Sequence, residues 1–110
     1  MKDVSFRDFV LDQLHRLGQI DCRRMFGSYG LYHGGVFFAI ISKGRLYFKT
    51  DMATRPEYER RGRVPFQPSA KQTLKSYYEV PVEVVEDDEQ LADWARRAVE
   101  SQVSGGQDFL

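Results

Sequence analysis

Few side chains in this chain could act as a nucleophile, and their spacing does not suit catalysis. Cys22 is the only cysteine, and it could form a thiol–imidazole pair with His15 or His33 if folding brought them together. Ser28 follows a glycine, but the Gly-x-Ser-x-Gly pattern of a nucleophile elbow is absent. A half-buried strand cysteine and a serine in a tight turn are simpler interpretations. We therefore expect no enzyme and assign no catalytic residue.

Metal and cofactor motifs are equally sparse. Asp8, Asp12 and His15 are spaced to share one face of a helix, which is also the pattern of any solvated face. The acidic run at 86–89 lacks the alternating oxygen ligands and the glycine of a calcium loop, and is better explained as anions at a helix N-terminus. Neither common glycine-rich phosphate loop is present. We expect no cofactor and no metal.

The remaining chemical feature is a basic segment with aromatic neighbours. The chain has 16 basic and 16 acidic residues, yet residues 43–75 alone hold nine basic and three acidic ones. Such a segment can bind a protein surface or a nucleic-acid strand, and it can also be a solvated loop whose Phe66 fills the core. The candidate partner-binding residues are Arg60, Arg61, Arg63, Lys71 and Lys75.

Length and composition limit the classes of protein that fit. A chain of 110 residues with 42% hydrophobic and 29% charged side chains is typical of one globular domain. Its longest apolar run, at 36–41, is far too short to cross a bilayer, and the N-terminus lacks the apolar core of a signal peptide. We expect a cytoplasmic domain with no membrane partner.

Helices are predicted near both ends. The first extends from a capping box of Ser5 and Asp8 to a stop at Gly18, and the last follows Asp87, which can cap it together with Gln90. Trp94 is central in the last apolar stripe, so we expect it in the core, against the sheet and the first helix. The two stripes are Phe6, Phe9, Val10, Leu14 and Leu17, and Leu91, Trp94, Ala95, Ala98 and Val99.

Between the helices the spacing becomes that of strands. Short glycine turns, among them 34–35 and 42–44, join the first four predicted strands, so neighbours must be antiparallel. The apolar run at 36–41 should be covered on both sides, whereas 45–50 alternates, with Leu46 and Phe48 on one face. Strands are expected at 22–26, 29–33, 36–42, 45–50 and 76–80, a short helix at 52–61, an irregular loop at 63–73, a helical turn at 81–85 and a flexible tail at 104–110. This order predicts an α+β two-layer sandwich, with an antiparallel sheet of about five strands packed against the N- and C-terminal helices.

Several sequence motifs, taken in their order along the chain, carry a family resemblance. Arg-Met-Phe-Gly-Ser-Tyr-Gly-Leu-Tyr at 24–32, Gly-Arg-Leu-Tyr at 44–47 and Ser-Tyr-Tyr-Glu-Val-Pro at 76–81 together resemble the TfoX N-terminal domain family. The resemblance extends to Trp-Ala-Arg-Arg at 94–97 and implies one domain over residues 1–103 with a two-layer α+β fold. Its motif residues are Arg24, Met25, Phe26, Gly27, Tyr29, Gly30 and Tyr32.

The resemblance also implies a function class. It links the chain to the TfoX/Sxy regulators of natural DNA uptake in bacteria, which act with a transcription activator of the cyclic-AMP-receptor type. Those regulators have a second domain, so this chain is similar to the stand-alone members, and the family has no agreed catalytic residues. The expected function is a non-enzymatic regulatory module acting by protein–protein contact. Nucleic-acid binding through 60–75 is the alternative, and a homodimer is a further option.

Two residue types in the motif need a physical explanation. Gly27 and Gly30 are expected to adopt backbone conformations that a β-carbon would penalise. Arg24 is expected to be partly buried, and a buried guanidinium needs an acceptor. The strand at 78–79 or the acidic last helix could supply one.

Overall fold

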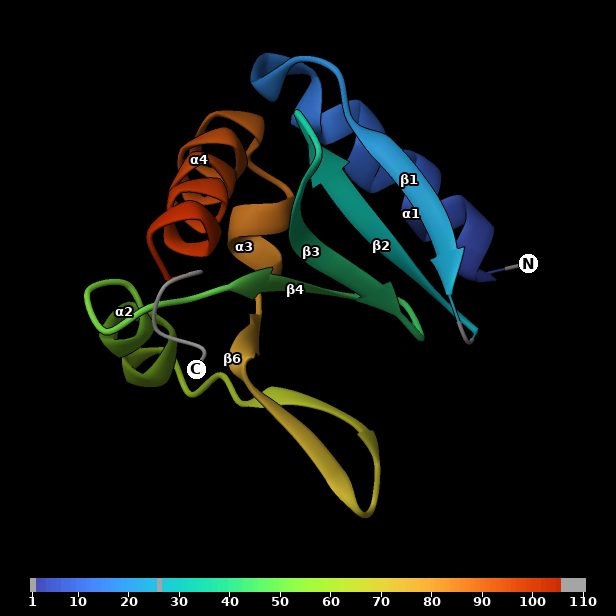
Figure 1. The fold of residues 1–110 in the computed structure, drawn as a ribbon. Helices are drawn as coiled ribbons and strands as arrows, with labels where there is room; N and C mark the ends of the chain where they lie inside the picture. Colours follow the sequence, from blue (N-terminus) through green and yellow to red (C-terminus); the bar gives the residue numbers. More distant parts are fainter. Residues whose placement is uncertain (1, 26, 106–110) are drawn as a thin grey trace.

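A computed structural model describes residues 2–25 and 27–105 of the chain (Figure 1). In chain order the elements are α1 (Lys2–Gln13), a 3-10 turn η1 (Leu14–Leu17), β1 (Asp21–Met25), β2 (Ser28–His33), β3 (Val36–Ser42), β4 (Arg45–Lys49), α2 (Arg55–Arg60), β5 (Pro65–Ser69), β6 (Gln72–Glu79), α3 (Val82–Val85) and α4 (Asp88–Gly105). The predicted α+β class, with helices at both ends of an antiparallel sheet, is confirmed. No helix in this described part is long and apolar enough to span a bilayer.

The sheet has six strands in the order β1-β2-β3-β4-β6-β5, all antiparallel. The additional strand is β5, so the prediction of an irregular loop over 63–73 is wrong. Pro65 and Pro68 argued against a strand, but β5 lies at the sheet edge, where half of the backbone N–H groups need no partner. Figure 1 shows the β5–β6 hairpin, in yellow, extending away from α1 and α4.

The main core lies on one face of this sheet. Every helix contributes to it, including Val10 of α1, Tyr58 of α2, Val84 of α3 and Leu91 of α4. Trp94 is 9% exposed within this core, as predicted. Its ring meets that of Tyr58 of α2 edge-on at 4.8 Å between centroids, a neighbour that the sequence did not predict beside the sheet and the first helix.

The helix ends follow the predicted signals only in part. α1 begins at Lys2, before Ser5, so Ser5 with Asp8 is not its cap. α1 itself ends at Gln13, but η1 continues the helical segment to the predicted stop at Gly18, whose φ is 101°. Asp87 caps α4 as predicted, because its Oδ1 accepts the N–H groups of Glu89 and Gln90, both at 3.2 Å. α4 continues to Gly105, two residues into the predicted tail; residues 106–110 lie outside the described residues.

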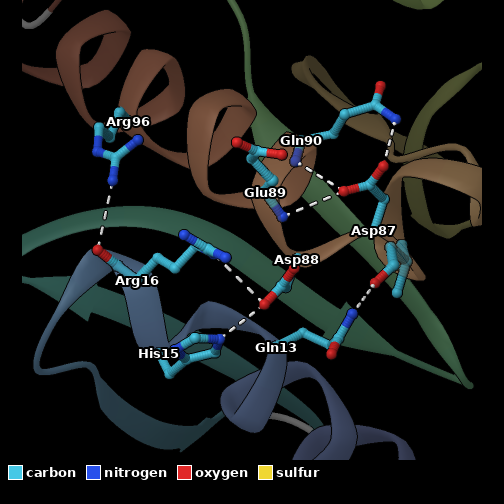
Figure 2. A network of polar contacts seen from close by, with 9 residues as sticks. Gln13, His15, Arg16, Asp87, Asp88, Glu89, Gln90 and Arg96 are labelled. Atoms are coloured by element: carbon cyan, nitrogen blue, oxygen red, sulfur yellow. Dashed lines mark hydrogen bonds and ion pairs between the residues drawn. The ribbon is translucent and has the colours of Figure 1, made fainter.

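A polar junction joins the end of the first helix to the start of α4 (Figure 2). Nε2 of His15 lies 2.8 Å from Oδ2 of Asp88, and Nε of Arg16 lies 3.4 Å from the same oxygen. Arg96 donates to the carbonyl of Arg16 at 3.3 Å, and Gln13 donates to a carbonyl of α3 at 2.9 Å. The hydrogen bond from His15 and the charge of Arg16 lower the pKa of the Asp88 carboxyl. This junction therefore stabilises the fold at neutral pH and weakens as the pH falls through that lowered pKa.

An irregularity in β3 decides which face each of its side chains occupies. Leu31 is opposite Ala39, but the next residue, Tyr32, is opposite Phe37, so Phe38 is an extra, bulged residue. Phe38 and Ala39 consequently both lie in the main core, while Phe37 and Ile40 belong to a cluster on the other face. The expected cover is present on the main-core side of this strand. On its other side, within the described residues, the side chains of neighbouring strands take the place of a second layer.

Candidate functional site

The sheet face opposite the helices carries its own cluster of large side chains, which we call the open face. Every member lies on a strand, whereas the main core draws on every helix. Within residues 2–25 and 27–105, the cluster on this face is therefore built without a helix. The open face comprises Met25, Tyr32, Phe37, Ile40, Tyr47, Phe66, Leu74 and Tyr77.

Strand alternation directs these side chains to the open face. Leu46 and Phe48 of β4 are buried in the main core, which confirms their predicted alternation and turns Tyr47 to the opposite side. On β6, Tyr78 packs in the main core against Tyr58, so its neighbour Tyr77 joins the open face. Sequence reasoning identified several of these rings as neighbours of the basic segment or as motif residues, but it did not bring them together on one face. The alternation of 45–50 was the signal for Tyr47.

The rings of the open face contact one another across strands that are not neighbours. The Phe37 ring lies 5.2 Å from that of Tyr32 and 5.5 Å from that of Tyr77, between centroids, although β4 separates β3 from β6. Tyr47 and Phe66 are 4.6 Å apart, and the guanidinium of Arg23 lies 4.5 Å from the Tyr32 centroid. Tilted rings at these separations stabilise one another. The open face is therefore an ordered apolar layer, in which Ile40, Phe66 and Tyr77 are buried and the other members are half-buried.

Gly30 explains how the Phe37 ring can lie so close to β2. A β-carbon at this position would be 3.0 Å from Cε1 of Phe37 and 3.2 Å from Sδ of Met25. Gly30 has no positive φ, so the expectation that it relieves backbone strain is wrong, and its function is to leave room. For Gly27 the same expectation is confirmed, since its φ is 80°.

One end of the open face is hollowed next to the β3–β4 turn. Tyr47 and Phe66 supply apolar lining, and Lys43 and Arg45 line it as well. Arg45 is paired with Glu79, so the positive charge beside the hollow is that of Lys43. The hollow measures about 120 Å³ and is lined in addition by Ser42, Gln67 and Pro68. A volume of this size suits one side chain of a partner better than a cofactor, because small-molecule sites enclose about 300 Å³ or more.

Two adjacent tyrosines on β6 should respond in opposite ways to loss of the hydroxyl. The hydroxyl of Tyr77 is buried with no hydrogen-bond partner among the described residues, whereas that of Tyr78 donates to Glu59 at 3.0 Å. We expect Tyr77→Phe to leave the free energy of unfolding unchanged or to raise it by up to about 1 kcal/mol, and Tyr78→Phe to lower it by about 1 kcal/mol. Urea denaturation of both variants tests this, and a larger loss for Tyr77→Phe would contradict it.

The predicted basic residues divide into two groups. Arg60 and Arg61, at the end of α2, both pair with Glu57; Arg61 also reaches Glu83 at 3.3 Å, and Arg63 reaches Glu79 at 3.8 Å. These arginines are thus satisfied by carboxylates of the same molecule. Lys71 and Lys75 are exposed on the β5–β6 hairpin, which extends away from the helices (Figure 1). The structure does not assemble the five candidates into one patch.

The remaining motif residues have structural positions. Tyr29 lies in the main core. Arg24 is exposed on the outer strand β1, so the expected partner for a buried guanidinium is not needed. Glu79, one of the expected acceptors, pairs instead with Arg45 at 3.2 Å and with Arg63. Phe26 lies outside the described residues.

The residues first considered for chemistry are dispersed. His33 Nδ1 lies 3.1 Å from the carbonyl of Gln19, His15 is held by Asp88, and burial raises the pKa of the Cys22 thiol, which disfavours the reactive thiolate. No group of three or more His, Cys, Asp or Glu side chains gathers in a metal-binding arrangement within the described ranges.

Comparison with known proteins agrees with the fold. The family model of the TfoX N-terminal domain matches residues 12–102, from the end of α1 to the last turns of α4. A search of the curated proteins finds no similar chain. The match covers the whole sheet and most of α4, but only the last two residues of α1. This chain belongs to the TfoX N-terminal domain family.

Proposed function

We propose that the chain is a non-enzymatic regulatory module that acts by contact with a protein partner through the open face. The observation that carries this proposal is the strand-built aromatic cluster with a hollow lined by Tyr47, Phe66 and Lys43. Aromatic side chains are enriched at the centres of protein interfaces, and charged side chains at the polar rim guide association. Membership of a family of regulatory domains supports the same class of function.

The ion pairs favour a protein partner over nucleic acid. Nucleic-acid affinity depends on cations that neutralise phosphates, and Arg60, Arg61 and Arg63 are already paired with glutamates. Lys71 and Lys75 are exposed, so nucleic-acid binding at the β5–β6 hairpin stays the weaker alternative. With a net charge of zero over the whole chain, long-range attraction to a polyanion is also small.

The cyclic-AMP-receptor-type transcription activator that the family resemblance implies is the proposed partner, in the bacterial cytoplasm. The contact surface of the activator should be acidic where it meets Lys43 beside the hollow. We expect the purified protein to bind the purified activator of its host, with an affinity that depends only moderately on salt. Binding to a 30-base-pair duplex and to a single strand of DNA serves as the comparison.

A matched pair of variants locates the contact. Lys43→Glu with Gln67→Glu alters two residues that line the hollow, and Lys71→Glu with Gln72→Glu makes the same change of charge at the exposed end of the hairpin. We expect the first pair to weaken activator binding at least about tenfold by like-charge repulsion and the second to change it little. Melting curves of both check that folding is intact.

Three outcomes would reject this proposal. The activator could fail to bind, or the hollow variant could bind as well as the wild type. Alternatively, DNA could bind tightly, with an affinity that falls steeply with salt and is lost in the hairpin variant; that result would establish nucleic-acid binding at the hairpin instead.

A further inference from the structure

The two edges of the sheet differ in their ability to accept another strand. β5 is protected, because Pro65 and Pro68 lack N–H groups and its pairing with β6 is irregular at two points. β1, at the opposite edge, has no proline and pairs regularly with β2 over all five of its residues. Three of those five residues are exposed, and β1 has only one strand neighbour in the described chain. The β1 edge is therefore open to strand addition.

We propose that two copies of the chain associate through this edge, with β1 antiparallel to β1 of the second copy and Cys22 opposite Cys22. This inference is independent of the proposed function, since it concerns an edge of the sheet and not the open face. The two-fold axis would pass through the sheet at Cys22, joining both sheets into one.

Symmetry allows only a few registers for such a pair. Residues directly opposite each other in an antiparallel pair point to the same face. The two-fold axis must therefore lie midway between the two copies of one residue, which then face each other across the pair. Centring on Asp21 would place two carboxylates directly opposite, and centring on Arg23 or Arg24 would place two guanidinium groups opposite. Like charges in this position are destabilising. Centring on Met25 would avoid like charges but would pair no opposite ones.

The register centred on Cys22 is the complementary one. It places Asp21 of each copy opposite Arg23 of the other, so that the dimer gains two symmetric pairs of opposite charge. Both side chains are exposed, and alternation puts them on the same face, where Arg23 lies over the Tyr32 ring. Arg24 meets Ile20 of the second copy and finds no charge there. Self-complementarity of the β1 sequence thus selects one register.

The dimer would also enlarge the open face. The two-fold axis is perpendicular to the sheet, so both open faces lie on the same side of a continuous sheet of twice six strands. Arg23 and Tyr32 of both copies would then lie near the centre of this combined surface. A two-fold symmetric partner could contact both halves at once.

Charge reversal tests the register in solution. We expect light scattering after size exclusion to show a dimer of the wild type at about 100 µM, a concentration chosen to populate a weak two-fold contact. Arg23→Glu should weaken the dimer at least about tenfold, because it turns both attractive pairs into repulsive ones. The swapped variant, Asp21→Arg with Arg23→Asp, should restore dimerisation. Arg24→Glu is the matched control, since it makes the same charge change on the same strand and should leave the dimer intact.

The single cysteine reports the register directly. Residues opposite each other in an antiparallel pair have Cα atoms about 4.5 or 5.5 Å apart, and both separations fit a disulfide. Diamide, which accepts the two electrons and two protons that a pair of thiols loses, should convert the wild type to a covalent dimer in non-reducing gels. Arg23→Glu, which keeps Cys22, should slow this cross-linking, and Arg24→Glu should not.

Any of three results would overturn the inference. The wild type could be monomeric at 100 µM and resist cross-linking. A dimer could persist unchanged in Arg23→Glu, which would place the interface elsewhere. Finally, Arg24→Glu could dissociate the dimer as strongly as Arg23→Glu does, which would indicate general electrostatics or another register instead of the Asp21–Arg23 pairs.

Discussion

Replacing Trp94 with alanine is expected to lower the free energy of unfolding by about 3–5 kcal/mol. Trp94 is 9% exposed in the main core, its ring meets Tyr58 edge-on, and the guanidinium of Arg61 lies 5.2 Å from its centroid. Truncation would remove the ring contact between α4 and α2 and leave a cavity, which the surrounding side chains fill only in part. A domain of this size has only about 5–15 kcal/mol in total, so the loss would be a large fraction of its stability.

Chemical denaturation measures the effect of the Trp94 substitution. Trp94→Phe keeps an aromatic ring in the same place and should cost clearly less, which preserves the test if the alanine variant does not fold. Val103→Ala is a control on the same helix, because Val103 is 61% exposed and should change stability by less than about 0.5 kcal/mol. A loss below about 1 kcal/mol for Trp94→Ala would contradict the assigned packing.

Gly30→Val is expected to cost about 1–3 kcal/mol, although valine is the better strand former. The new side chain would overlap the Phe37 ring and Met25, which lie 3.0 and 3.2 Å from the position of a β-carbon. These side chains would have to leave their places on the open face, disturbing the contacts of Phe37 with Tyr32 and Tyr77. The loss should appear as a lower midpoint in urea.

A double-mutant cycle separates crowding from backbone strain at Gly30. Phe37→Leu shortens the side chain over Gly30, so the combination with Gly30→Val should cost clearly less than the sum of the two single changes. Additive losses would show that the ring does not limit position 30. The same cycle tests whether the open face is ordered as described, because the coupling depends on the placement of Phe37.

The sequence by itself determined the local order of this fold. Glycine turns predicted at 34–35 and 42–44 required antiparallel neighbours, and in the structure the second is the two-residue turn 43–44. The apolar stripe of 91–99 placed Trp94 inside, and Asp87 marked the start of α4. The alternation of 45–50 correctly separated Leu46 and Phe48 from Tyr47. These features depend on residues within a few positions of one another, so their signals are present in any short window of the chain.

Only the tertiary structure decided what the basic and aromatic residues do. Arg61 is satisfied by Glu83, 22 positions away, and Glu79 holds both Arg45 and Arg63; no local pattern identifies such partners. The strand β5 forms in spite of two prolines because it is an edge strand, and an edge exists only once the order of the sheet is settled. Likewise Gly30 is needed because the Phe37 ring of the next strand lies against it. Phe37 meets Tyr77 only because the sheet places β3 and β6 on the two sides of β4. Contacts between distant segments depend on the arrangement of the whole sheet, which local periodicity does not contain.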